Sequence, residues 1–121
     1  MAGIMIVEDS ITVRRSLRLI LEKNGYTIVA EASNGLDAIE KYKKARPDIV
    51  TMDIAMPEMN GVDAMKEIRK EFPNAKIIMV SAYKDKELVI NSLKFGAKGY
   101  ILKPIDQKKL IDTIEFVLQD I

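Results

Sequence analysis

Short apolar runs alternate with amphipathic segments along the whole chain. The five runs that we interpret as strands are residues 4–7, 26–32, 48–52, 77–80 and 100–102. Each run is followed by a segment whose apolar residues recur at helical spacing, as Val13, Leu17, Ile20 and Leu21 do in the first. Strands that alternate with helices through short connections predict right-handed βαβ units and a parallel sheet.

Local signals place the ends of the helices. Asp9 or Ser10 can cap the first helix, and Gly96 closes the fourth, over about 85–95. The apolar residues that we expect to face the core are Leu36, Ile39 and Tyr42 in the second helix, Met65, Ile68 and Phe72 in the third, and Leu110, Ile114, Val117 and Leu118 in the fifth.

The polarity of the runs indicates which strand lies at an edge of the sheet. Runs one, three and four are almost entirely apolar, as strands covered on both faces should be. Run two carries Thr27 and Glu31, which suits an edge strand. With this strand at an edge, the chain fits the doubly wound order 2-1-3-4-5 of flavodoxin-like folds, which we adopt from known folds. We therefore predict an α/β fold, a single (βα)5 domain over residues 1–121 with no output domain.

Composition limits the partners, the location and the catalytic groups that the chain can have. The chain has 121 residues, 48% of them hydrophobic, which is enough for one core. A net charge of +1 gives no basic excess for nucleic acid or an anionic membrane. No apolar stretch approaches the ~18 residues of a membrane span and no signal peptide is visible, so we expect a cytoplasmic protein. The sequence has no Cys and no His, which leaves carboxylates, Lys, hydroxyls, backbone or a hard metal for any catalysis.

Polar residues end four of the five runs. They are Glu8-Asp9 after the first, Asp53 after the third, Ser81-Ala82 after the fourth and Lys103-Pro104 after the fifth. Because ligands bind at the carboxyl ends of parallel strands, these groups should converge. Two carboxylates about 4 Å apart repel by roughly 4 kcal/mol at an effective dielectric near 20, and Lys103 offsets only part of this. A hard divalent cation would resolve the rest, and the all-oxygen ligands favour Mg²⁺.

A carboxylate, a metal and a lysine together make a phosphoryl-transfer site. An aspartate is ionised at neutral pH and needs no general base to act as a nucleophile. We therefore predict that Asp53 attacks phosphorus, while Mg²⁺, Lys103 and Ser81 hold the phosphoryl oxygens. Two residues also have simpler interpretations, since Asp9 could merely cap the first helix and Ser81 could cap the fourth or bond to a turn.

Four segments carry a family resemblance, namely "IMIVEDS", "PDIVTMDIAMPEMNG", "IIMVSAY" and "GAKGYILKPI". In this order and spacing the sequence resembles the CheY-like response-regulator receiver domain of two-component signalling, over essentially the whole chain. The resemblance implies Asp53 as phosphoacceptor, and Glu8, Asp9, Asp53 and the backbone carbonyl of Ala55 as Mg²⁺ ligands, with Glu8 acting largely through water. It further implies Ser81, Ala82 and Lys103 around the phosphoryl group, a cis bond before Pro104, Ser81 and Tyr100 as switch pair, and Ala55 and Tyr83 as positions that tune signal lifetime.

The function that this resemblance implies is signalling rather than turnover of outside substrates. We predict a stand-alone receiver that takes its phosphoryl group from a histidine kinase or phosphotransfer protein and promotes its own phosphorylation and dephosphorylation. It would signal to a partner protein through the face of the fourth helix, fifth strand and fifth helix, with chemotaxis as the first pathway to test. We expect a monomer that binds neither nucleic acid nor membrane directly, with a dimer on phosphorylation left open.

Other functions stay open at this point. The chain could be a phosphorelay intermediate or a receiver excised from a transcriptional regulator. It could also be an aspartyl phosphatase or phosphotransferase, although phosphatases of the haloacid-dehalogenase type carry a second Asp where this chain has Ala55. A flavin-binding module is disfavoured, because Glu8-Asp9 would repel a phosphate at the place where a flavodoxin binds one.

Overall fold

The computed structural model describes residues 2–119, in which five strands alternate with five helices. The strands are β1 (Gly3–Val7), β2 (Thr27–Ala32), β3 (Ile49–Met52), β4 (Ile77–Ser81) and β5 (Gly99–Leu102). The helices are α1 (Ile11–Lys23), α2 (Gly35–Ala45), α3 (Gly61–Glu71), α4 (Lys86–Lys94) and α5 (Gln107–Leu118). All neighbouring strands are parallel, in the order β2-β1-β3-β4-β5, which confirms the predicted fold class and strand order.

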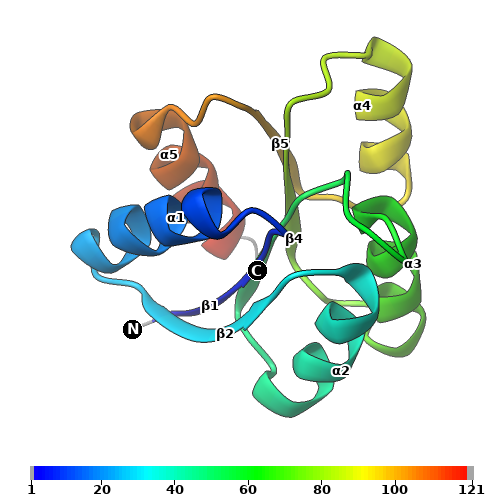
Figure 1. Cartoon of the computed structure of the whole chain (residues 1–121), viewed down its shortest axis with the longest axis horizontal. Helices are drawn as coiled ribbons and strands as arrows, with labels where there is room; N and C mark the ends of the chain where they lie inside the picture. Colours follow the sequence, from blue (N-terminus) through cyan, green and yellow to red (C-terminus); the bar gives the residue numbers. More distant parts are fainter. Residues whose placement is uncertain (1, 120–121) are drawn as a thin grey trace.

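The sheet separates two layers of helices. Helices α1 and α5 cover one face, and α2, α3 and α4 cover the other (Figure 1). Strand β1 supplies both sides, because successive side chains of a strand point to opposite faces. Ile4 and Ile6 pack with α1 and α5, whereas Met5 and Val7 pack with α2 and α3. Each face therefore has its own apolar cluster, and β3 is the central strand, flanked by β1 and β4.

Side-chain caps begin each helix. The capping residues are Ser10, Asn34, Asn60, Asp85 and Asp106, each accepting a hydrogen bond from a backbone N–H in the first turn. Ser10 rather than Asp9 caps α1, and Asp85 rather than Ser81 caps α4. Capping therefore accounts for neither residue, but the Ser81 hydroxyl does bond to the turn that follows it, by accepting from the Tyr83 N–H.

Helix α4 is packed differently from the other helices. Within the described residues it buries a single residue, Ser92, whose hydroxyl donates to the Leu88 carbonyl over 2.9 Å. Ile90 and Leu93 are 44% and 45% exposed. Across residues 2–119, no helix is both long and apolar enough to cross a lipid bilayer.

One of the predicted core positions is wrong. Leu36 is 48% exposed, and the buried face of α2 is instead formed by Gly35, Ala38 and Tyr42. The small residues at 35 and 38 let this helix approach its neighbours closely, a contact that hydrophobicity alone does not indicate. Phe72 packs against the core as predicted, but it follows the last turn of α3 as its C-terminal cap, with its ring tilted against that of Tyr42 at 5.1 Å between centroids.

Candidate functional site

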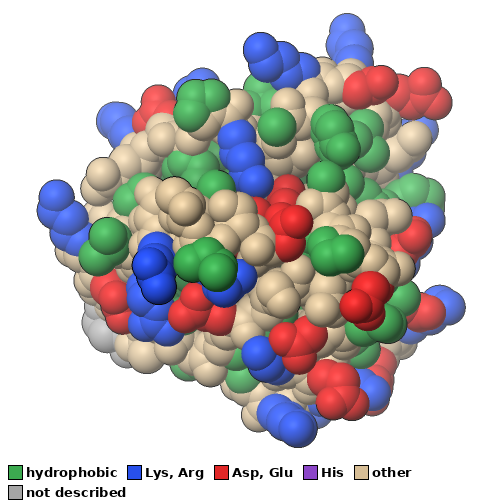
Figure 2. Space-filling model, viewed as in Figure 1, with side chains coloured by type: hydrophobic (Ala, Val, Ile, Leu, Met, Phe, Trp, Pro, Cys, Tyr) green, Lys and Arg blue, Asp and Glu red, His purple; other side chains and the backbone are tan. Residues whose placement is uncertain are grey.

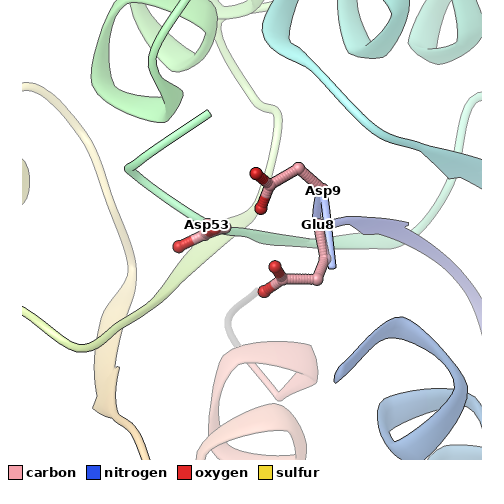
Figure 3. Close-up of side chains that lie close together, drawn as sticks. All are labelled: Glu8, Asp9 and Asp53. Carbon is pink, nitrogen blue, oxygen red and sulfur yellow. The ribbon is translucent and has the colours of Figure 1, made fainter. Parts of the chain in front are cut away.

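Three carboxylates meet where β1 and β3 end. Val7 and Met52 are paired neighbours in the sheet, so the residues that follow them emerge side by side. Glu8, Asp9 and Asp53 each place a carboxylate oxygen within 4.8 Å of the others (Figure 3). Glu8 and Asp53 are 1% and 6% exposed, whereas Asp9 is exposed. The predicted convergence of these carboxylates is therefore present in the structure.

Lys103, which follows β5, reaches into the same cluster. Its Nζ lies 2.7 Å from Glu8 Oε1 and 3.4 Å from Asp53 Oδ1. The lysine is thus an ion-pair partner of Asp53, as the sequence predicts, but it lies closer to Glu8. Its backbone N–H donates to the Ser81 carbonyl over 2.9 Å, which joins the ends of β4 and β5. The bond between Lys103 and Pro104 is cis, as expected.

Burial and mutual repulsion shape the protonation of these groups. Burial raises the pKa of Glu8, and the charge of Asp53 adds to this, although hydrogen bonds from Lys103 and the Ser10 N–H oppose it. Burial likewise raises the pKa of Asp53, against the charge of Lys103. Burial alone would lower the pKa of Lys103, but its carboxylate partners outweigh that effect and raise it. The cluster has more negative charge than one ammonium group compensates.

Backbone hydrogen bonds and a close backbone contact fix the position of Asp53. Its N–H donates to the Val7 carbonyl over 2.9 Å, and its Oδ1 accepts from the Ile54 N–H over 2.9 Å. Gly61, the first residue of α3, packs directly against this strand end, and its N–H donates to the Ile54 carbonyl. A Cβ built on Gly61 would lie 1.9 Å from the Asp53 carbonyl oxygen. Only glycine fits here without moving the backbone of Asp53.

The predicted switch residues are joined through Tyr83. The buried Ser81 hydroxyl accepts a hydrogen bond from the Tyr83 N–H over 3.1 Å. The Tyr100 hydroxyl donates to the Tyr83 carbonyl over 2.8 Å. Ala82, which follows Ser81, is exposed at this edge, as is Ala55, which follows Asp53 by two residues. Tyr83 is 47% exposed, so the loop between β4 and α4 presents its side chain to solvent.

Sequence reasoning missed Arg14. This residue of α1 donates from Nη1 to the Glu8 carbonyl over 2.7 Å, and its Nε pairs with Glu31 of β2 at 3.1 Å. Arg18, one turn further along, also binds Glu31. Two arginines spaced i, i+4 opposite an acidic residue in the edge strand are a signal that could have found this contact.

The donor set fits a hard divalent cation. All three side chains offer carboxylate oxygens, which such ions prefer over nitrogen or sulfur ligands. The pKa increases of Glu8 and Asp53 show that the pocket disfavours its own negative charge, and a cation would relieve this. Figure 2 shows acidic side chains at the centre of this face of the molecule, next to basic ones.

Comparison with known proteins gives the family. The sequence profile described as "Response regulator receiver domain" matches residues 4–115. The chain therefore belongs to the response-regulator receiver domain family, as predicted. Among its relatives, the chemotaxis protein CheY of Thermotoga maritima is 49% identical over 114 residues, covering 94% of this chain and 95% of that protein. The chemotaxis protein CheY of Bacillus subtilis is 46% identical over 115 residues, covering 95% and 96%.

A solved structure agrees with this assignment. The chain is similar to one in the CheX–CheY–BeF3–Mg²⁺ complex from Borrelia burgdorferi, with a TM-score of 0.94 and 36% identity, covering 96% of this chain and 88% of that one. The chain is thus a CheY-like receiver, a class of signalling protein.

Proposed function

We propose that Asp53 accepts a phosphoryl group from a phosphohistidine of a histidine kinase or phosphotransfer protein. A carboxylate oxygen of Asp53 attacks phosphorus, the new O–P bond forms as the P–N bond to the donor breaks, and the leaving imidazole takes up a proton from solvent. The observation that carries this proposal is a buried aspartate at a strand end, 3.4 Å from the Lys103 ammonium and beside two further carboxylates. The product is an acyl phosphate, whose lability suits a reversible signal.

The same residues would bind Mg²⁺. The side chains of Glu8, Asp9 and Asp53, with the backbone carbonyl of Ala55, are the ligands that we propose, with Glu8 acting through water. When bound, Mg²⁺ would supply positive charge against both the carboxylates and the phosphoryl oxygens. Glu8 suits an indirect role, because its Oε1 already accepts from Lys103 and its Oε2 from the Ser10 N–H.

The remaining residues would receive the phosphoryl group and transmit its presence. The ammonium of Lys103 would pair with one phosphoryl oxygen, and the Ser81 hydroxyl, beside Ala82, would turn from the Tyr83 N–H toward another. The Tyr100 hydroxyl would then release the Tyr83 carbonyl, and the ring would turn inward. Phosphorylation would in this way shift an existing equilibrium between two conformations. Ala55 offers no side chain to position a hydrolytic water, and Tyr83 would partly shield the phosphoryl group.

A small phosphodonor tests the acceptor. With Mg²⁺ and acetyl phosphate, the intact mass should rise by one phosphoryl group, and chelation by EDTA should prevent the gain. Asp53→Asn should abolish it, whereas Asp112→Asn, which changes an exposed aspartate of α5, should leave it intact. An unmodified wild type under these conditions would overturn the proposal.

We propose chemotaxis as the pathway, in the cytoplasm, because the most similar of the relatives named above, both of matching length, are chemotaxis proteins. A Bacillus subtilis strain that lacks its own CheY provides the test. Expression of this chain should restore spreading in soft agar, and the Asp53→Asn variant should not. If the wild-type chain is phosphorylated in that strain and spreading is still absent, the chain serves a different pathway.

The downstream partner would bind the face formed by α4, β5 and α5. This face exposes Ile90 and Leu102, each 44% accessible. Replacing both by Ser should abolish spreading while leaving phosphorylation by acetyl phosphate unchanged. Leu36→Ser is the matched control, because Leu36 is exposed to a similar extent, 48%, on α2. Equal effects of the two changes would show that this face has no special role.

A further inference from the structure

We propose that Arg14 is a positioning residue that sets the affinity of the acidic cluster for Mg²⁺ by holding the peptide between Glu8 and Asp9. This inference rests on the proposed metal site and adds a residue to it from outside the ligand set. Arg14 lies on α1, and its side chain is 20% exposed. Its guanidinium joins the carbonyl of Glu8, at 2.7 Å, to the carboxylate of Glu31, at 3.1 Å.

The anchor for Arg14 is itself fixed. Glu31 lies in the edge strand β2, and its other carboxylate oxygen accepts from Arg18 Nε and Nη2 over 2.9 and 2.6 Å. Its backbone carbonyl accepts from Lys41 Nζ over 2.5 Å. Glu31 therefore has little freedom to move, and it orients the guanidinium of Arg14 toward the loop after β1.

The bond from Arg14 fixes the direction of Asp9. The Glu8 carbonyl belongs to the peptide that leads into Asp9, and the Glu8 N–H on the other side donates to the Ala32 carbonyl over 2.9 Å. Both polar groups of Glu8 are thus held, so the plane of the next peptide is set. Asp9 is exposed, and packing gives its carboxylate little guidance. A ligand held in place before the ion arrives loses less conformational freedom on binding, which raises affinity.

Two other roles for Arg14 make different predictions. If Arg14 only held α1 against β2, replacing Arg14 or Arg18 should have the same effect on Mg²⁺ binding, since both bind Glu31. The two differ in that Arg14 also donates to the Glu8 carbonyl. If Arg14 acted only through its charge, removing it would strengthen cation binding by the nearby carboxylates. Loss of positioning would weaken binding. The sign of the change therefore separates a positioning role from an electrostatic one.

Titration with Mg²⁺, followed by the backbone amide signals of Asp9 and Ile54 in ¹⁵N NMR, tests the proposal. Arg14→Met should raise the dissociation constant by about tenfold, and Arg14→Lys should also raise it, because an ammonium cannot bond to the Glu8 carbonyl and Glu31 in the fixed fork of a guanidinium. Arg18→Met loosens Glu31 but leaves the bond from Arg14 to the Glu8 carbonyl, so it should raise the constant by less than Arg14→Met does. Without metal, the Asp9 amide signal should move further in Arg14→Met than in Arg18→Met.

The possible failures are distinct. Wild-type protein that does not bind Mg²⁺ would overturn the proposed metal site, and the role of Arg14 with it. Wild-type binding together with an unchanged or tighter constant in Arg14→Met would overturn this inference alone. If Arg14→Met and Arg18→Met weaken Mg²⁺ binding equally, Arg14 only holds α1 against β2 and does not position Asp9. If Arg14→Met does not fold, as judged by circular dichroism, the same comparison is made between Arg14→Lys and Arg18→Lys.

Discussion

Replacing Asp53 by Asn should make the metal-free protein more stable, although it removes the proposed phosphoacceptor. Asp53 lies within 4.8 Å of carboxylate oxygens of Glu8 and Asp9, and 3.4 Å from Lys103 Nζ. At an effective dielectric near 20, each repulsion is worth about 3.5 kcal/mol and the attraction about 5 kcal/mol. Solvent screens the exposed Asp9, so repulsion and attraction nearly cancel.

The cost of burying the charge of Asp53 then decides whether the substitution raises or lowers the free energy of unfolding. Asp53 is 6% exposed, and burial is the largest cause of its raised pKa. Asn has the same shape, keeps an oxygen for the Ile54 N–H, and carries no charge that needs water. We expect the free energy of unfolding to rise by about 1–2 kcal/mol, the usual cost of an imperfectly compensated buried polar group.

Urea unfolding followed by circular dichroism, in EDTA and again in Mg²⁺, measures this change. Wild type should gain about 2.7 kcal/mol when Mg²⁺ is at a hundred times its dissociation constant, and the variant should gain much less. Asp112→Asn removes an aspartate from an exposed pair with Lys108 and should change stability by less than about 0.5 kcal/mol in either condition. An Asp53→Asn variant less stable than wild type in EDTA would refute the reasoning, because attraction to Lys103 would then outweigh burial and repulsion.

Three further predictions concern the same site. Gly61→Ala should destabilise the fold by about 1–3 kcal/mol and slow phosphorylation by acetyl phosphate, since its Cβ would overlap the Asp53 carbonyl; wild-type stability in urea would contradict the close approach. Lys103→Gln should destabilise the metal-free protein by about 2–4 kcal/mol in the same assay, because Glu8 and Asp53 lose their common cation; an unchanged midpoint would show that the ion pairs contribute nothing net. The pKa values of Glu8 and Asp53 are raised, so the folded state retains their protons to higher pH than the unfolded chain. Their contribution to metal-free stability should therefore increase as pH falls from 7 toward their ordinary pKa values of 4.5 and 3.8. The measurement is the free energy of unfolding of wild type minus that of the Glu8→Gln/Asp53→Asn double variant, taken across this pH range. A difference that does not change with pH would oppose the reasoning.

Much of the site could be predicted because it depends on topology. Once the runs are strands in the order 2-1-3-4-5, the residues after β1 and β3 must be neighbours, whatever their rotamers. The convergence of Glu8, Asp9 and Asp53 follows from that order, whereas Lys103, which follows β5, reaches them through its long side chain. The cap signal gave the start of α1 to within one residue for a similar reason, since a short polar side chain satisfies the first N–H groups locally.

Other features depend on contacts that no local pattern encodes. The sequence does not tell which carboxylate Lys103 approaches most closely, because that depends on side-chain conformations at positions 95 residues apart. The requirement for glycine at position 61 arises from the backbone of Asp53 rather than from a turn of its own. Leu36 was misplaced because the close packing of α2 uses small residues, which carry little weight in a hydrophobic pattern.

The sparse packing of α4 sets how easily this part of the molecule can open. A helix held by one buried serine and a few half-buried apolar groups has little apolar surface to lose when it separates from the sheet. Its amide hydrogens should exchange with solvent sooner than those of α3, which buries Gly61, Ala64, Met65 and Ile68. The carboxylates thus follow strands β1 and β3, whose residues are all buried, whereas α4 has little buried surface to resist a movement away from the sheet.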